Sequence, residues 1–173
     1  PYCDFNSHVR DNMHEAEMKS ALLTELDHYA SLVGVRKLGS IFFGGGTPSL
    51  MAASTVSEVI DQAYKHFHVS DNIEITLEAN PTSVEAGKFA DFADAGVNRV
   101  SLGIQALNEN DLKALGREHS VNEAMDAIDL SQQYFKRSNF DLIYARMGQT
   151  LSDWEAELKK AIALANGHLS LYQ

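Results

Sequence analysis

The sequence predicts an α/β protein built on a parallel β-sheet, and two observations support this. Five short apolar runs, each long enough for a strand, recur about every 25–35 residues. Longer amphipathic segments, with apolar residues at helical spacing, lie between them. Strands that alternate with helices are typical of βαβ units. The expected strands are 38–43, 72–79, 99–104, 139–144 and 168–172, and the expected helices are about 13–32, 54–67, 83–95, 120–135 and 152–165.

The boundaries of these elements are marked by turn and capping residues. The first strand ends in a glycine turn, and the second places Ile73, Ile75 and Leu77 on one face before Asn80-Pro81 stops it. Gly96 and Gly167 follow helical patterns, where a left-handed residue commonly ends a helix. Three expected helix starts fit the capping-box pattern S/T-x-x-E, at 82–85, 120–123 and 152–155.

An open doubly wound sheet and a β/α barrel both fit this order of elements. Polar or glycine residues stand where strands end: Gly44–Gly46 after the first, Glu78 in the second and Gln105 after the third. In a barrel such residues gather at the carboxyl ends of the strands, which favours the barrel. The periodicity alone leaves both architectures open.

Composition narrows the class of protein. The 173 residues suit one domain, and 24 acidic against 14 basic residues give a formal net charge of −10. The sequence has no cluster of Lys and Arg, so a nucleic acid or an anionic membrane is not expected as a partner. No apolar run reaches the roughly 18 residues of a membrane span. A single cysteine excludes an internal disulfide framework and fits the cytoplasm.

The segment Gly44-Gly45-Gly46-Thr47-Pro48 is the first candidate site. Three glycines let a ligand approach the backbone closely, and Thr47 adds a hydroxyl. The segment matches neither of the common glycine-rich nucleotide motifs, and a tight strand-to-helix turn explains it equally well.

Polar side chains near the other strand ends are further candidates. The Glu78 carboxylate is suited to an ammonium group or ribose hydroxyls, and we favour this interpretation over a solvated strand face. Arg117 is suited to a carboxylate, although a surface arginine is the simpler interpretation. Asp141 lies between apolar residues and needs a partner if buried, which Arg117 or a ligand would supply. The seven histidines show no zinc-type spacing.

The ends of the chain predict a fragment of a longer protein. It begins Pro1-Tyr2-Cys3 without Met, and it ends in a strand-like run. Cys3 supplies one thiolate, whereas an iron–sulfur cluster needs several.

Taken together, these segments resemble the radical-SAM superfamily, and within it the coproporphyrinogen-oxidase-like branch, most closely its heme chaperones. The resemblance runs nearly end to end, in the expected order. The matching segments are Pro-Tyr-Cys-Asp-Phe-Asn-Ser-His at 1–8, Phe-Gly-Gly-Gly-Thr-Pro-Ser at 43–49, Glu-Ala-Asn-Pro at 78–81, Asn-Arg-Val-Ser-Leu-Gly-Ile-Gln at 98–105, Leu-Gly-Arg-Glu-His at 115–119 and Asp-Leu-Ile-Tyr at 141–144.

The resemblance implies a fold and two cofactors. The fold would be a partial (β/α)₆ barrel, with 1–173 as the radical-SAM core domain, lacking its first strand and its C-terminal region. Cys3 would be the third ligand of a 4Fe–4S cluster whose other two cysteines lie upstream, and Tyr2 would lie near the adenine of S-adenosylmethionine (SAM). The SAM pocket would be lined by Gly45, Gly46, Thr47, Glu78, Gln105, Arg117 and Asp141.

Two departures from the family pattern bear on function. The oxidase has a further cysteine two residues after the third ligand, where this chain has Phe5, which favours a heme chaperone. The chaperone would bind heme and pass it to an acceptor protein, with transient membrane association as one setting. The alternatives are oxygen-independent coproporphyrinogen III oxidation and a β/α-barrel enzyme without iron.

The second departure lies after the fourth expected strand. Asp-Leu-Ile-Tyr is commonly followed by Gly-Leu-Pro in the family, and here by Ala145-Arg146-Met147.

Overall fold

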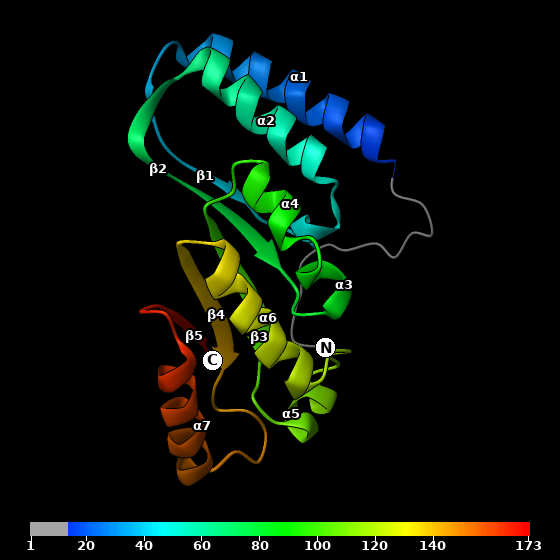
Figure 1. The fold of residues 1–173 in the computed structure, drawn as a ribbon, viewed down its shortest axis with the longest axis vertical. Helices are drawn as coiled ribbons and strands as arrows, with labels where there is room; N and C mark the ends of the chain where they lie inside the picture. The colour runs from blue at the N-terminus through cyan, green and yellow to red at the C-terminus, as the bar shows by residue number, and fades with distance from the viewer. Residues whose placement is uncertain (1–13) are drawn as a thin grey trace.

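The structure is a computed structural model that describes residues 14–173. Five strands alternate with helices along the chain, as the sequence predicts (Figure 1). The strands are β1 (Lys37–Phe43), β2 (His68–Ala79), β3 (Arg99–Gln105), β4 (Arg137–Ile143) and β5 (Leu169–Tyr172). The helices are α1 (Glu15–Val33), α2 (Ala53–His66), α3 (Ser83–Ala86), α4 (Phe89–Asp94), α5 (Glu109–Ala114), α6 (Val121–Tyr134) and α7 (Leu151–Leu164), with a 3₁₀ turn, η1, at Pro48–Leu50.

The five strands form one parallel sheet in the order β1-β2-β3-β4-β5. Each strand therefore pairs with the next one along the chain, whereas a doubly wound sheet reverses its strand order at a switch point. In Figure 1 the sheet curls as it passes from β1 to β5. The arrangement is a half-barrel, and this settles the choice of architecture that the periodicity left open.

The convex face of the sheet is apolar and carries the core. Alternate residues of β2, β3 and β4 are almost fully buried and pack against α2, α4 and α6. Phe89 and Phe92 of α4 are the largest of these fully buried side chains. The core strand residues are Ile75, Leu77, Val100, Leu102, Ile104, Phe140 and Leu142.

The concave face is polar because the residues between the core positions carry polar side chains. The strand register aligns Thr76 with Arg99, Glu78 with Ser101, and Asp141 with Ser170. Glu74, Thr76 and Glu78 thus lie on one face, as the alternation in 72–79 predicts. The inner face of the half-barrel is the side on which polar groups can meet a ligand.

Two expected helices differ in detail from the sequence prediction. The helix expected at 83–95 is two short helices, α3 and α4, and α5 was not predicted. The capping box at Ser120 and Glu123 is confirmed, but the last helix is capped by Thr150 and Asp153 in place of the expected Ser152 and Glu155. Gly96 and Gly167 have the expected positive φ angles of 104° and 83°.

Helix α1 has the expected length but buries little. Its only buried residue is Ala30, while Met18 and Leu32 are exposed. It lies beside α2 and makes few other contacts within the described part of the chain (Figure 1). No helix in residues 14–173 is long and apolar enough to span a membrane.

Candidate cofactor site at the carboxyl ends of the strands

The glycine segment after β1 is open on the side where a ligand could approach. Cβ atoms built on Gly45 and Gly46 would meet nothing within 4 Å, and Gly45 has a φ angle of 126°, which favours glycine. The Thr47 hydroxyl donates to the Gly46 carbonyl at 2.8 Å. The chain then turns into η1, where Pro48 and Ser49 are buried. The buried end anchors a loop whose glycines stay accessible.

Glu78 of β2 lies directly against this loop. The Gly45 N–H donates to Glu78 Oε2 at 3.2 Å, and a Cβ on Gly44 would lie 3.3 Å from the same oxygen. That Cβ would also lie 2.7 Å from the Phe42 ring, so only glycine fits at position 44 without a shift. The sequence prediction that these residues share a site is therefore consistent with the geometry.

A chain of hydrogen bonds connects three of the strand-end loops. Ser49 donates its hydroxyl to the buried carboxylate of Glu85. Glu85 Oε2 also accepts from the Asn80 N–H at 2.9 Å. Asn80 Oδ1 in turn accepts from Arg117 Nη2 at 2.7 Å, and the same nitrogen donates to the Gly103 carbonyl at 2.8 Å. Arg117 thus connects the loop after β2 to the end of β3.

Gln105 ends β3 in an unusual conformation. Its φ angle is 73°, and its side chain is largely buried. The register between β3 and β4 shifts between Leu102 and Gln105, which marks a β-bulge. Bulges re-aim side chains and are common beside functional sites. A Cβ on Gly103 would lie 3.2 Å from Gln105 Nε2, so the glutamine side chain lies over Gly103.

Asp141 of β4 is a mostly buried carboxyl on the same inner face. The pKa of Asp141 is raised to about 6, chiefly by burial and to a smaller degree by the charge of Glu78, against the Ser170 hydroxyl and Arg99, which act to lower it. Asn139 Nδ2 lies 3.4 Å from Asp141 Oδ1 and 3.0 Å from Ser170 Oγ. The structure thus surrounds Asp141 with neighbours from β4 and β5, while Arg117 bridges Asn80 and Gly103.

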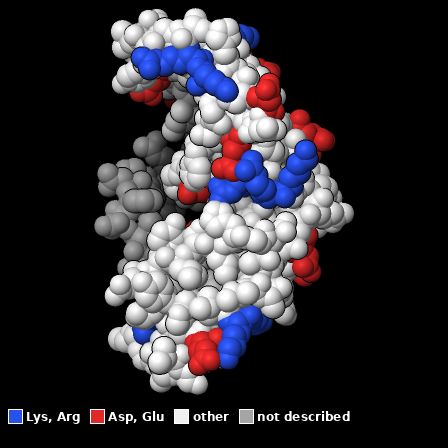
Figure 2. All heavy atoms as spheres, turned by 90° about the vertical axis from the view of Figure 1, so that its left-hand side faces the viewer, with Lys and Arg blue, Asp and Glu red and all other residues white. Residues whose placement is uncertain are grey.

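A second cluster of charges lies at the other end of the inner face. Glu74 pairs with Arg137 at 2.8 Å and with Arg99 at 3.6 Å, and Arg99 Nη2 lies 3.2 Å from His168 Nδ1. A cavity of about 320 Å³ lies among these residues. The paired signs are typical of this surface: in Figure 2, basic side chains stand in small groups with acidic ones beside them.

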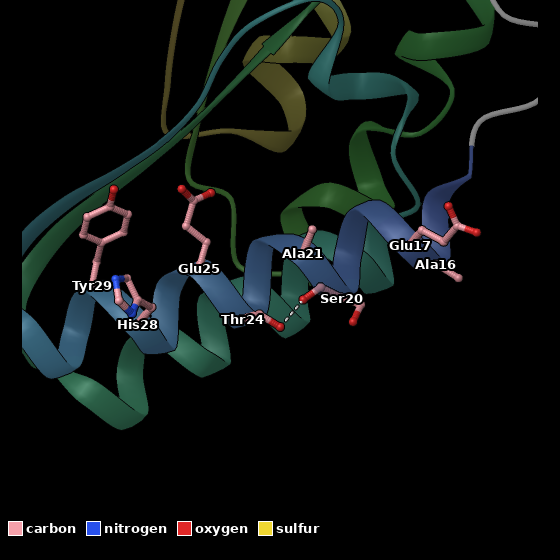
Figure 3. A pocket seen from close by; sticks show the side chains of 8 residues that line it. All are labelled: Ala16, Glu17, Ser20, Ala21, Thr24, Glu25, His28 and Tyr29. Atoms are coloured by element: carbon pink, nitrogen blue, oxygen red, sulfur yellow. Dashed lines mark hydrogen bonds between the residues drawn. The ribbon is translucent and has the colours of Figure 1, made fainter.

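Another hollow lies away from the strand ends, along one side of α1. It is an open groove of about 860 Å³, lined by side chains of that helix alone (Figure 3). Its only internal side-chain bond is from the Thr24 hydroxyl to the Ser20 carbonyl, at 2.8 Å. Because no polar groups from other elements converge on it, we place the candidate site at the strand ends.

The loop after β4 departs from the family pattern and folds around a buried ion pair. Ala145 has a φ angle of 56°, the left-handed conformation that the family's glycine adopts easily. Arg146 Nη2 lies 2.6 Å from Glu157 Oε2 and 2.6 Å from Asp111 Oδ2, with only 6% of the arginine side chain exposed. Glu157 Oε1 accepts from the Leu107 N–H at 2.7 Å. The loop is therefore held in place by the ion pairs of Arg146 with Glu157 and Asp111.

Two predicted site residues, Tyr2 and Cys3, lie outside the described residues. Within 14–173, no three His, Cys, Asp or Glu side chains are grouped so that they could hold a metal ion. Cys3 as a ligand of an iron–sulfur cluster therefore stays a prediction.

The described residues fit SAM as a ligand. The glycine loop leaves open space beside the Glu78 carboxylate, which is suited to an ammonium group. Asp141 and Gln105 add a carboxyl and an amide near the same strand ends, which are suited to hydroxyl groups. The donor set thus matches a ligand that carries an amino acid moiety and a ribose.

Comparison with known proteins decides the family. The model of the radical SAM superfamily matches residues 1–161. This chain belongs to the radical-SAM superfamily. It is 41% identical over 179 residues to the heme chaperone HemW of Haemophilus influenzae, covering 100% of this chain and 47% of that protein. It is 38% identical over 173 residues to radical S-adenosyl methionine domain-containing protein 1, mitochondrial, of Danio rerio, covering 99% of this chain and 39% of that protein.

A solved radical-SAM structure shows the same fold. Coproporphyrinogen III oxidase (HemN) from Escherichia coli superposes with a TM-score of 0.84 at 27% identity, covering 98% of this chain and 40% of that enzyme. The partial radical-SAM barrel expected from the sequence is therefore confirmed. The chain spans less than half the length of these three proteins.

Sequence reasoning missed residues that join the predicted site residues to one another. Asn80 and Asn139 each contact side chains from neighbouring strands or loops, and Glu85 joins two loops. Asn139 had a readable signal, because it precedes Asp141 by two residues on the same face of one strand. The role of Glu85 depends on contacts between distant segments and had no such signal.

Proposed function

We propose that this chain is the radical-SAM domain of a heme chaperone, which binds a 4Fe–4S cluster, SAM and heme and passes the heme to an acceptor protein. The observation that carries the proposal is the 41% identity to a heme chaperone across the whole chain, against 27% to the structurally similar oxidase. Phe5, where the oxidase branch has a cysteine, supports the same choice.

The residues of the strand ends have definite roles in this proposal. Glu78 and the glycine loop at Gly45, Gly46 and Thr47 would hold the amino acid part of SAM. Gln105, Arg117 and Asp141 would line the rest of its pocket. Cys3 would be one of the three thiolate ligands of the cluster, with Tyr2 beside the adenine. When bound, the reduced cluster and SAM supply one-electron chemistry, which the protein must shelter and orient.

Oxygen-independent coproporphyrinogen III oxidation is the second candidate. The TM-score of 0.84 to the E. coli oxidase favours it, because the barrel of this chain has the geometry found in that enzyme. Similar barrels can serve different functions, so the fold does not separate the two candidates. The heme chaperone is preferred on sequence identity.

The proposal also implies a setting for the protein. We place it in the cytoplasm, with heme and an acceptor protein as partners and with any membrane contact transient. A single cysteine in the sequence suits a reducing compartment.

A hemin titration of the anaerobically reconstituted full protein tests the proposal, with coproporphyrinogen turnover measured on the same preparation. A heme chaperone should give saturable absorbance changes that end near one heme per monomer, and no porphyrinogen turnover. Turnover of coproporphyrinogen without saturable hemin binding would replace this proposal with the oxidase.

A further inference from the structure

The end of β3 contains an irregularity in its pairing with β4, at Gly103 and Ile104. The register shift places Gly103 and Ile104 opposite the single residue Asp141 of β4. The next residue, Gln105, has its φ angle at 73°, which is uncommon for a residue with a side chain. Such a conformation persists only where the surroundings hold it in place.

Two side chains from one loop bind the carbonyls of Gly103 and Ile104. Arg117 Nη2 donates to the Gly103 carbonyl at 2.8 Å, and His119 Nε2 lies 3.2 Å from the Ile104 carbonyl. Both residues belong to the short connection between α5 and α6. Two consecutive carbonyls of the bulge are thus bound by residues two positions apart in one loop.

The hydrogen bond to the Ile104 carbonyl identifies one ring nitrogen of His119 that carries a proton. A carbonyl only accepts, so Nε2 must carry the proton. Burial, and then the nearby charge of Arg117, lowers the pKa of His119, although the Ile104 carbonyl, Glu123 and Glu109 act in the opposite direction. The side chain is 4% exposed. The imidazole is therefore neutral near pH 7, with its proton on Nε2.

The conformation held in this way decides where Gln105 points. Its Nε2 lies 3.2 Å from the position of a Cβ on Gly103, and Arg117 Nη2 lies 3.8 Å from the same position. The absence of a side chain at Gly103 gives the glutamine amide its place on the inner face.

We infer that His119 is a positioning residue, which holds the bulge at Ile104 so that the Gln105 amide faces the strand-end site and contributes to ligand affinity there. The inference rests on the proposed SAM site. It concerns a residue that is buried and whose side chain bonds to the backbone of β3.

A double-mutant cycle on SAM affinity in the reconstituted full protein tests the inference. We expect His119→Leu and Gln105→Ala each to weaken SAM binding about tenfold. If His119 acts through Gln105, the double variant should be no weaker than the weaker single variant, within about twofold. Additive losses, about a hundredfold together, would overturn the inference. His119→Gln should stay close to the wild type, because its amide can donate to the same carbonyl.

Two further measurements keep the outcomes distinct. Should His119→Leu fail to fold, His119→Asn takes its place in the cycle, because its shorter amide stays polar but ends short of the Ile104 carbonyl. If Gln105→Ala weakens SAM binding and His119→Leu does not, the inference fails while the SAM site stands. If Gln105→Ala has no effect, the inference also fails, and Gln105 leaves the proposed site. Independently of SAM, imidazole ¹⁵N shifts should show His119 with its proton on Nε2, and any other tautomer would contradict the inference.

Discussion

The side-chain amide of Asn139 connects Arg99 to Asp141 across the inner face of the half-barrel. Its Oδ1 accepts from the Arg99 guanidinium, and its Nδ2 lies 3.4 Å from Asp141 Oδ1. Asn139 is 2% exposed. A neutral amide thus stands between a cation and a carboxyl, so Asp141 receives a polar neighbour without a direct ion pair. This arrangement explains why burial prevails in setting its protonation.

Asp141→Asn should stabilise the ligand-free protein at neutral pH. The folded-state pKa of about 6 is above the ordinary 3.8, so the folded state holds the proton more tightly. The contribution of Asp141 to stability is therefore fully present below about pH 4 and is lost as the pH rises through 6. At pH 7 the penalty is about 2–3 kcal/mol. Urea unfolding at several pH values should show a flatter profile for the variant.

The same substitution should weaken SAM binding if Asp141 lines the pocket. The exposed Asp129 of α6 provides the control, since Asp129→Asn should change neither stability nor affinity. An Asp141→Asn protein that is less stable than the wild type at pH 7.5 would contradict the assigned protonation.

Ala145→Gly should stabilise the protein by about 1 kcal/mol. Ala145 has a φ angle of 56°, and a side chain in that conformation costs roughly 1–2 kcal/mol that glycine does not pay. The larger entropy of glycine in the unfolded chain offsets part of the gain. Ala156→Gly is a matched control in the exposed middle of α7, where the same change should cost about 1 kcal/mol. Equal losses at both positions would contradict the strain at Ala145.

Arg146→Leu should destabilise the protein by about 3–5 kcal/mol, although the family pattern has leucine there. Removing the guanidinium leaves Glu157, whose side chain is 8% exposed, as a buried charge without its partner. The double variant with Glu157→Gln should recover most of the loss, because the amide oxygen still accepts from the Leu107 N–H. Thermal unfolding measures both effects.

An exposed ion pair in α7, the helix that carries Glu157, serves as the control for Arg146. Lys159 and Glu155 lie 2.7 Å apart with more than half of each side chain exposed, so Lys159→Ala should cost less than about 0.5 kcal/mol. Equal losses of stability in the Arg146 and Lys159 variants would show that the buried ion pair contributes no more than an exposed one.

The sequence predicted the strand positions well because strand burial leaves a local pattern. Apolar runs and the residues that end them reflect the sheet directly, and the polar inner face was visible in the alternation of Glu74, Thr76 and Glu78. The short helix α5 was missed, although Asn108 caps it by accepting from the Asp111 N–H. A helix of six residues has too little periodicity to be recognised from apolar spacing.

The interactions within the site were less predictable because they join distant segments. The pattern at 82–85 predicted that Glu85 bonds back to its own helix start, and Thr82 does cap that helix. The Glu85 side chain instead binds Ser49 and Asn80, because a buried carboxylate gains more from three donors of two loops. The bulge at Gln105 likewise depends on Arg117 and His119, which no local pattern around β3 reveals.

The most direct test of the account is a SAM titration of the reconstituted full protein, comparing the wild type with Glu78→Gln and with Glu118→Gln, an exposed control. Cluster iron is counted in each sample. Glu78→Gln keeps the side-chain shape but removes the charge beside the Gly45 N–H, so SAM should bind about 10–100 times more weakly while iron is unchanged. Glu118→Gln should bind SAM as the wild type does. Unchanged SAM affinity in Glu78→Gln would contradict the placement of the SAM site at these strand ends.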